Sequence, residues 1–315
     1  MQRKKKIIII VIAAVLALAL IGGTVGIYAL AVSIYQGSFN YRCETSEEDA
    51  FDLSEFPTLS RERHTFATMQ GHTLVGYLYK NTEITAPKAV IVFAHGMGGG
   101  GQTGYMDIFD FFCTKGYCVF AYDATANDES EGEVMGGLPQ GFIDLDYAIT
   151  YAQGLDELQN LPFMLMGYSW GGLSVVNALN THPEVAAVAS LAGWNKSMNM
   201  IDHRGCQMVG PVAKLLLPFA SVYEYFAYGR YAFSTGMKGF SNSDCAVMIV
   251  HGEQDDTIPI DYGYGTYYET YAEDERFIFK KYPDRDHSVM TLEDGSLDMD
   301  LMAEICAFFD AQLEN

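Results

Sequence analysis

The chain has 315 residues, of which 49% are hydrophobic, so it can bury one large core without disulfides or metals. Acidic residues outnumber basic ones by 40 to 19, for a net charge of −21, and Lys and Arg cluster only at the extreme N-terminus. This charge pattern argues against nucleic acid as a partner, and we expect the acidic surface to serve solubility.

The N-terminus predicts a membrane segment. Four basic residues, Arg3 to Lys6, precede an uncharged, mostly apolar stretch at 7–34 that is long enough to cross a bilayer. The charges favour a cytoplasmic tail of residues 1–6 and an extracytoplasmic remainder at the cell membrane. A cleaved signal peptide is the alternative, because Ala29-Leu30-Ala31 resembles a cleavage site that would leave Val32 as the mature N-terminus. The length of the stretch favours an uncleaved signal-anchor.

Residues 35–60 are polar, acidic and aperiodic, which predicts a stalk between the membrane and a folded domain at 61–315. From Arg63 onward, apolar and polar residues alternate on both sides of Gln70-Gly71. This alternation around a turn dipeptide predicts a β-hairpin.

Strand and helix patterns then alternate along the chain. Continuous apolar runs predict buried strands at 88–96, 116–123, 163–166, 185–193, 245–252 and 276–283. Helical spacing predicts helices at 105–114, at 141–153, from Trp170 to about 180, and at 297–313. The alternation predicts an α/β fold: a mostly parallel sheet with helices on both faces and an antiparallel start.

The alternation stops at 194–243, an insertion rich in Tyr, Phe, Met and Leu that we interpret as a helical cap. Aromatic residues form one cluster in the cap and a second cluster after it: Tyr223, Tyr225, Phe226, Tyr228 and Tyr231, then Tyr262, Tyr264, Tyr267, Tyr268 and Tyr271. Two interpretations stay open, because these rings could line an apolar pocket under a lid or pack the cap against the core.

The six cysteines include no C-x-x-C pair and have no histidines at zinc-like spacing. We therefore expect no structural metal site and no cofactor. The expected state is free buried thiols, with Cys113 and Cys118 the one local pair to test for a disulfide.

The stretch Gly167-Tyr168-Ser169-Trp170-Gly171 lies between a predicted strand and a predicted helix, and its glycines permit a tight turn with Ser169 at the tip. A serine nucleophile needs a base and an acid that orients the base. Asp255 and Asp256 follow the strand at 245–252, and His287 follows the last strand. The order Ser, Asp, His along the chain is the one expected for a serine nucleophile in this architecture.

These segments resemble motifs of the α/β-hydrolase superfamily from about Arg63 to the C-terminus. The matching segments are "HGMGGG", "GYSWGG", "HGEQDDTIP" and "DHSVM". Within the superfamily the sequence most resembles the bacterial esterase and serine-aminopeptidase-like branch. The resemblance implies a serine hydrolase with Ser169 as nucleophile and His287 as base. The branch pattern H-G-x-x-D-x-x-V-P falls on His251 to Pro259, with Ile258 in place of Val, and therefore selects Asp255 over Asp256 as the acid.

The backbone N–H of Trp170, which follows the nucleophile, is a candidate donor to the oxyanion, and the resemblance implies that Met97 supplies the second. The resemblance also matches Ser130-Glu131-Gly132 to a loop that carries a basic residue in relatives. That basic residue is missing here, so no substrate contact is assigned to the loop.

The expected function is therefore a membrane-anchored, extracytoplasmic serine hydrolase, most simply a carboxylesterase for small or medium acyl esters. An acylaminopeptidase-like peptidase and a lipase or thioesterase are the alternatives within enzymes, because one fold hosts all these reactions. A binding module without catalysis is the alternative from another class. The complete set Ser169, Asp255 and His287 argues against it.

Overall fold

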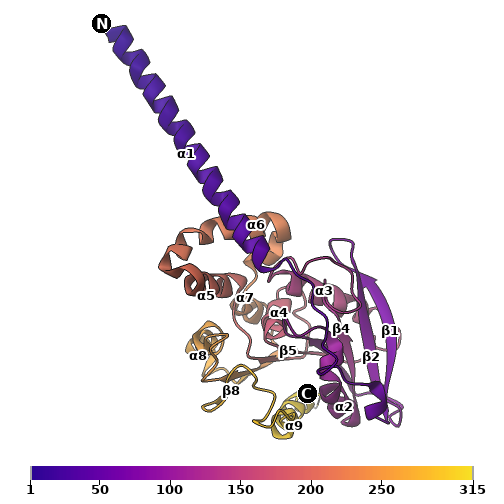
Figure 1. The fold of residues 1–315 in the computed structure, drawn as a ribbon. Coiled ribbons are helices and arrows are strands. Elements are labelled where there is room, and N and C mark those ends of the chain that lie inside the picture. Colours follow the sequence, from indigo (N-terminus) through magenta and orange to yellow (C-terminus); the bar gives the residue numbers. More distant parts are fainter. Residues whose placement is uncertain (1, 314–315) are drawn as a thin grey trace.

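The computed structural model describes residues 2–313, and its centre is an eight-stranded sheet (Figure 1). The spatial order is β1-β2-β4-β3-β5-β6-β7-β8. In chain order the strands are β1 (Leu59–Ala67), β2 (Thr73–Asn81), β3 (Ala89–Ala94), β4 (Tyr117–Tyr122), β5 (Phe163–Tyr168), β6 (Ala187–Leu191), β7 (Ala246–Gly252) and β8 (Phe277–Tyr282). Pairs β1–β2 and β2–β4 are antiparallel and the other neighbours are parallel. The predicted α/β class, the hairpin and the antiparallel start are confirmed.

Helices cover both faces of the sheet, as continuous apolar strands require. On one face α2 (Met106–Thr114) and α9 (Met299–Asp310) share a buried cluster that includes Phe109 and Phe309. The other face is covered by α3 (Gln140–Gln153), α4 (Trp170–Ala178) and α8 (Tyr264–Tyr271). These helices lie where the sequence predicts them, apart from α8, for which no helix was predicted.

The insertion at 194–243 is helical. Its elements are α5 (Ser197–Val209), α6 (Leu217–Tyr228) and α7 (Gly236–Asn242), separated by the 3₁₀ helices η3 (Gly210–Leu215) and η4 (Gly229–Phe233). Helix α7 packs on α4, whereas α6 packs against the first helix of the chain. The insertion thus joins the sheet domain to the N-terminal helix.

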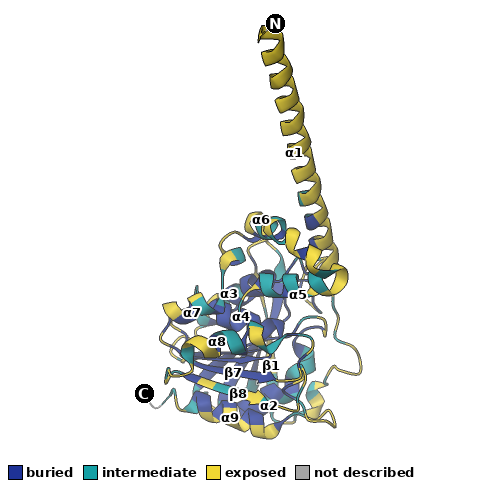
Figure 2. Cartoon of the chain, turned by 90° about the vertical axis from the view of Figure 1, so that its left-hand side faces the viewer, coloured by how far each residue is buried: buried dark blue, intermediate teal, exposed yellow. Residues whose placement is uncertain are grey.

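That first helix, α1 (Gln2–Ser38), has 37 residues and extends beyond both ends of the predicted span at 7–34. It projects away from the domain, and its side chains are exposed for most of its length (Figures 1 and 2). It is long and apolar enough to cross a membrane, which fits an anchor or a signal sequence. Its first buried residues are Ala31 and Tyr35, where it reaches the domain.

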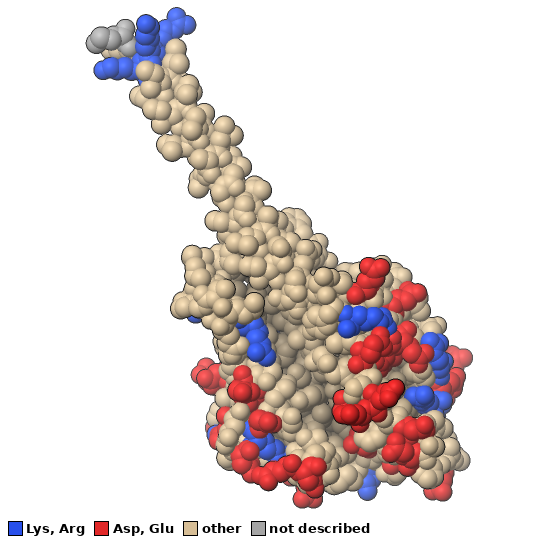
Figure 3. Space-filling model, in the orientation of Figure 1, with Lys and Arg blue, Asp and Glu red and all other residues tan. Residues whose placement is uncertain are grey.

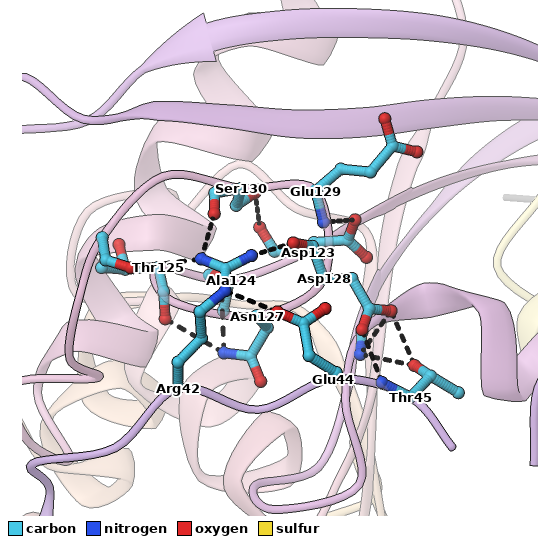
Figure 4. A network of polar contacts seen from close by, with 12 residues as sticks. Arg42, Glu44, Thr45, Asp123, Ala124, Thr125, Asn127, Asp128, Glu129 and Ser130 are labelled. Atoms are coloured by element: carbon cyan, nitrogen blue, oxygen red, sulfur yellow. Dashed lines mark hydrogen bonds and ion pairs between the residues drawn. The ribbon is translucent and has the colours of Figure 1, made fainter. Parts of the chain in front are cut away.

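The segment 35–60 does not form the stalk that the sequence predicts. After α1 ends, the chain lies along the loop at 123–132 (Figure 4). Cys43 N donates to Ala126 O at 2.9 Å, and Thr45 N donates to the Asp128 carboxylate at 2.6 Å. Arg42 Nη1 donates to the carbonyl of Ser130 at 2.7 Å. Polar composition indicates a segment free of the domain, but here several of its polar groups have partners on the domain although most of its side chains are exposed.

All six cysteines are free thiols, and no disulfide joins Cys113 to Cys118. Four of them are buried, as expected, whereas Cys43 and Cys206 are half-buried.

Candidate active site

Ser169 forms the turn between β5 and α4 by itself, because the strand ends at Tyr168 and the helix begins at Trp170. Its φ of +55° lies in a region that L-residues other than glycine rarely occupy. A Cβ on Gly171 would lie 1.9 Å from the carbonyl oxygen of Ala94, and one on Gly167 would lie 2.3 Å from that of Gly171. Glycine is therefore required at both positions to bring the helix this close to the sheet.

The structure brings Ser169, His287 and Asp255 into one chain of hydrogen bonds. His287 Nε2 lies 2.8 Å from Ser169 Oγ, and His287 Nδ1 lies 2.7 Å from Asp255 Oδ2. Ser169, His287 and Asp255 follow β5, β8 and β7, at the carboxyl ends of parallel strands in the same half of the sheet. This geometry permits proton transfer from Ser169 to His287 while Asp255 orients the imidazole.

Asp255 is held as a carboxylate, whereas Asp256 is exposed. Burial alone would raise the pKa of Asp255, but hydrogen bonds from His251, His287 and the backbone N–H of Ile258 outweigh it and lower the pKa well below its usual range. The Ile258 N–H donates to Asp255 Oδ1 at 2.7 Å. Asp256 has only a weak 3.5 Å contact from the hydroxyl of Thr257. The geometry therefore favours Asp255 over Asp256 as the partner of His287.

The loop that carries His287 is braced on two sides. Arg285 pairs with Asp298 at 2.6 Å and donates to the carbonyl of Val289 at 2.8 Å. On the other side, Tyr168 donates its hydroxyl to the carbonyl of His287 at 3.2 Å, and the two rings lie 5.3 Å apart. The imidazole is thus positioned by tertiary contacts as well as by Asp255.

The two other histidines at strand ends, His95 and His251, make buried contacts that hold the loops around the site. Burial lowers the pKa of His95, so its ring is neutral, with Nδ1 donating to the carbonyl of Gly96 and Nε2 accepting from Ala124 N. His251 lies 3.2 Å from Asp255 Oδ2, a contact that the sequence analysis missed. The sequence did contain a signal for this contact, since His251 and Asp255 are four residues apart at the end of the same strand.

The two predicted oxyanion donors lie near the serine, and their role stays a prediction. Trp170 is the first residue of α4, and N–H groups in the first turn of a helix lack partners within that helix. Met97 is half-buried and lines the same cavity as Ser169 and His287.

A cavity of about 900 Å³ extends from Ser169 and His287 toward the N-terminal helix. Its walls are mainly aliphatic and come from the cap and from α1; they include Ile34, Met200, Met208, Leu216 and Leu217. None of the ten aromatic residues in the two predicted clusters lines it. The interpretation that these ten rings line the pocket is therefore wrong.

The packing interpretation describes several of these rings. Tyr231 donates its hydroxyl to Asp146 on α3, and Tyr223 packs on Tyr35 at 5.1 Å between ring centres. Tyr267 is buried against Phe240 of α7, with 4.9 Å between centres. These aromatic residues join the cap and α8 to their neighbours, and the aromatic side chains that do line the cavity are Tyr35, Phe39 and Trp194.

A basic residue from elsewhere in the chain, Arg42, contacts the 123–132 loop. The guanidinium of Arg42 reaches the carbonyls of Asp128, Ser130 and Gly132 (Figure 4). No local sequence signal could have found this contact, since 86 to 90 residues separate the partners. The arginine stabilises the loop from outside, and the loop does not line the cavity.

Within residues 2–313, no group of three or more His, Cys, Asp or Glu side chains could hold a metal ion.

Comparisons with known proteins match the chain to hydrolase families. Residues 85–227 match the family model described as serine aminopeptidase, S33, and residues 161–315 match the prolyl oligopeptidase family. The chain is also 31% identical over 150 residues to the quorum-quenching protein AidA of Acinetobacter baumannii. That match covers 44% of this chain and 47% of the relative, so the chain spans about half of the relative's length.

Solved structures share the fold over most of the chain. An esterase from Pyrococcus furiosus has a TM-score of 0.63 at 15% identity, over 86% of this chain and 97% of the esterase. An acylaminoacyl peptidase from Pyrococcus horikoshii has a TM-score of 0.60 at 17% identity, over 82% of this chain and 43% of the peptidase. With the two overlapping family models, these matches place the chain in the α/β-hydrolase superfamily, and the matched families are families of serine hydrolases.

Proposed function

We propose that the protein is a membrane-anchored serine hydrolase that acts outside the cytoplasm as a carboxylesterase. One observation carries the proposal: the hydrogen-bonded chain of Asp255, His287 and Ser169 ends at an apolar cavity of about 900 Å³. A cavity of this size and aliphatic character suits the acyl part of an ester.

In the proposed reaction Ser169 Oγ attacks the acyl carbon while His287 Nε2 takes the hydroxyl proton. Negative charge that develops on the carbonyl oxygen is stabilised by the N–H groups of Met97 and Trp170. His287 then donates its proton to the leaving alcohol, which departs and leaves an acyl group on Ser169. Water attacks this ester with His287 as base, and the acid and free serine are released.

The first test is labelling of the full-length protein in detergent with a fluorophosphonate probe, beside Ser169→Ala. The full chain is needed because Tyr35 and Phe39 are buried against the domain, so removal of α1 would open the cavity. We expect labelling that the variant loses, followed by hydrolysis of acyl esters in preference to acyl-peptides. A well-folded parent without labelling would favour the binding-module alternative. Hydrolysis of acyl-peptides in preference to esters would favour the peptidase.

The anchoring and topology are part of the same proposal. Support comes from the exposed apolar helix α1 and from the basic residues Arg3 to Lys6 at its start. Sequencing of the mature N-terminus and protease accessibility of the domain in intact cells test both points. A mature chain that begins near Val32 would mean a secreted enzyme.

A further inference from the structure

The cap carries an exposed apolar surface beside α1, which we call the apolar cap face. Its residues come from α5, η3 and α6: Met208, Val209, Val212, Leu215, Val222 and Phe226. Leu215 is 69% exposed and Phe226 is 76% exposed, which is unusual for side chains of this kind in a monomeric soluble protein. In Figure 3 the surface next to α1 is almost free of acidic residues, which gather on the part of the domain away from the helix.

The length of α1 places this face at the membrane surface. Residues 7–30, which are exposed apart from the half-buried Tyr28, span about 36 Å at about 1.5 Å per residue, and the hydrocarbon core of a bilayer is about 30 Å thick. With Lys6 at the inner surface, Ala31, where α1 first becomes buried, lies at the level of the outer headgroups. The apolar cap face beside it lies at the same level. The two cap segments Ser197–Leu215 and Leu217–Asn242 are also long and apolar enough to cross a membrane if they are counted together as one bent span.

The cavity opens at this level. The cavity-lining residues that are exposed belong to two elements, α1 and α5, and include Ile34, Gly37, Met208 and Val209. Ser169, by contrast, is buried at the other end. The mouth of the cavity therefore lies between α1 and α5, and the membrane helix itself forms part of the wall.

The lower end of α1 is attached to the cap by a buried polar contact. Tyr35 donates its hydroxyl to Glu224 of α6 at 2.6 Å, and Ser197 of α5 donates to the same carboxylate oxygen. The part of α1 that lines the cavity is therefore held in place relative to the cap. One lining side chain, Arg204 on α5, carries a permanent charge, and within residues 2–313 no ion pair involves it.

We propose, on the basis of the hydrolase function above, that the substrate is an acyl lipid of the outer leaflet. The lipid passes from the bilayer through the mouth between α1 and α5, so that its acyl chain fills the aliphatic cavity and its ester reaches Ser169. Arg204 at the mouth faces the headgroup and favours an anionic lipid. The apolar cap face holds the mouth at the leaflet surface.

The docking of the cap is tested with tryptophan probes in the full-length protein, reconstituted in vesicles of brominated phosphatidylcholine. Trp170 and Trp194 are both buried, so the parent measures the background. Phe226→Trp places a probe on the apolar cap face, and Met299→Trp places a control on α9, where Met299 is 54% exposed. We expect bromine to quench the added emission of the first probe and not of the second. An unquenched probe at 226 would overturn the proposal and point to a protein partner for the face.

Entry from the bilayer is tested with two substrates: a self-quenched fluorescent phosphatidylglycerol in phosphatidylcholine vesicles and the water-soluble p-nitrophenyl butyrate. The variant Val212→Asp/Leu215→Asp/Phe226→Asp changes exposed side chains that do not line the cavity. We expect it to hydrolyse the vesicle substrate about tenfold more slowly and the soluble ester at the parent's rate, since charge expels the face from the interface. Met299→Asp is the matched control, with both rates unchanged.

The outcomes separate this proposal from the proposed function. If the parent hydrolyses the soluble ester but not the vesicle lipid, or if the triple variant loses both activities equally, lipid entry is wrong and the hydrolase stands. If Ser169 is not labelled and neither ester is hydrolysed, the proposed function itself fails.

Discussion

The two ends of the cavity are formed by different kinds of contact. At the sheet end, Ser169 and His287 are held by hydrogen bonds, by a positive φ and by contacts that admit no side chain on Gly171. At the α1 end, mainly aliphatic side chains from α1 and the cap form the wall together with Tyr35 and Phe39, and a buried polar contact is made at Glu224. We infer that the sheet end determines the reaction, which needs fixed geometry, whereas the α1 end determines the substrate, which needs apolar area.

The largest expected effect comes from the acid at the sheet end. Asp255→Asn should lower kcat for ester hydrolysis by about 10³-fold, because the amide can stabilise the wrong tautomer of His287. Asp256→Asn is the matched control, and its kcat should stay within about twofold of the parent, as for an exposed residue. Steady-state kinetics on p-nitrophenyl butyrate measures both. Equal losses in the two variants would mean that the acid is assigned to the wrong carboxylate.

A change at the α1 end of the cavity should alter substrate choice and leave the chemistry intact. Leu216 is half-buried and lines the cavity, so Leu216→Trp should occupy space that a long acyl chain needs. We expect kcat/KM to fall about tenfold for a long-chain ester and to stay unchanged for an acetyl ester. A chain-length series of p-nitrophenyl esters measures this selectivity. A uniform loss over the series would show that the wall also positions Ser169.

The attachment of α1 to the cap should depend on pH. Burial raises the pKa of Glu224 to about 7, although Ser197 and Tyr35 donate to it. The native state therefore binds more protons than the unfolded state between about pH 4.5 and 7, so the free energy of unfolding falls as pH rises through this window. Glu224→Gln removes this contribution. When the pH is raised from about 5 to about 8, the free energy of unfolding of Glu224→Gln should rise by roughly 1 to 3 kcal/mol relative to that of the parent.

Urea unfolding in detergent at the two pH values measures this difference, with the exposed Glu269→Gln as the control for loss of a charge. Part of the slope should remain in the variant, because burial also raises the pKa of Asp123 to about 7 and that of Asp144 to about 6. If the free energy of unfolding changed equally with pH in the parent and in Glu224→Gln, Glu224 would not contribute to the pH dependence.

The smallest expected effect concerns Arg204. An exposed cation that faces a lipid headgroup contributes about 1 kcal/mol, so the parent should prefer phosphatidylglycerol over phosphatidylcholine by about fivefold. Arg204→Gln should abolish this preference without a change in the rate on p-nitrophenyl butyrate. Lys214→Gln, which removes an exposed charge of the same cap that does not line the cavity, is the control. If Arg204→Gln kept the preference for phosphatidylglycerol, Arg204 would not be the residue that contacts the headgroup.

The sequence by itself determined the features that depend on local pattern. Apolar runs and helical spacing located the strands and most helices, and the apolar stretch at 7–34 located α1, because burial and periodicity leave their mark within one element. The glycines around Ser169 and the order of Ser169, Asp255 and His287 along the chain were sufficient to predict residues that the fold brings together.

Only the tertiary structure decided how distant segments meet. Tyr35 contacts Glu224 across 189 positions, and Arg42 reaches Ser130 across 88. Neither contact has a periodic signature, since each depends on where whole elements pack. For the same reason composition placed aromatic residues in the cap but could not determine that aliphatic side chains, and α1 itself, would line the cavity. A polar segment such as 35–60 carries the same composition whether its partners are water or the domain.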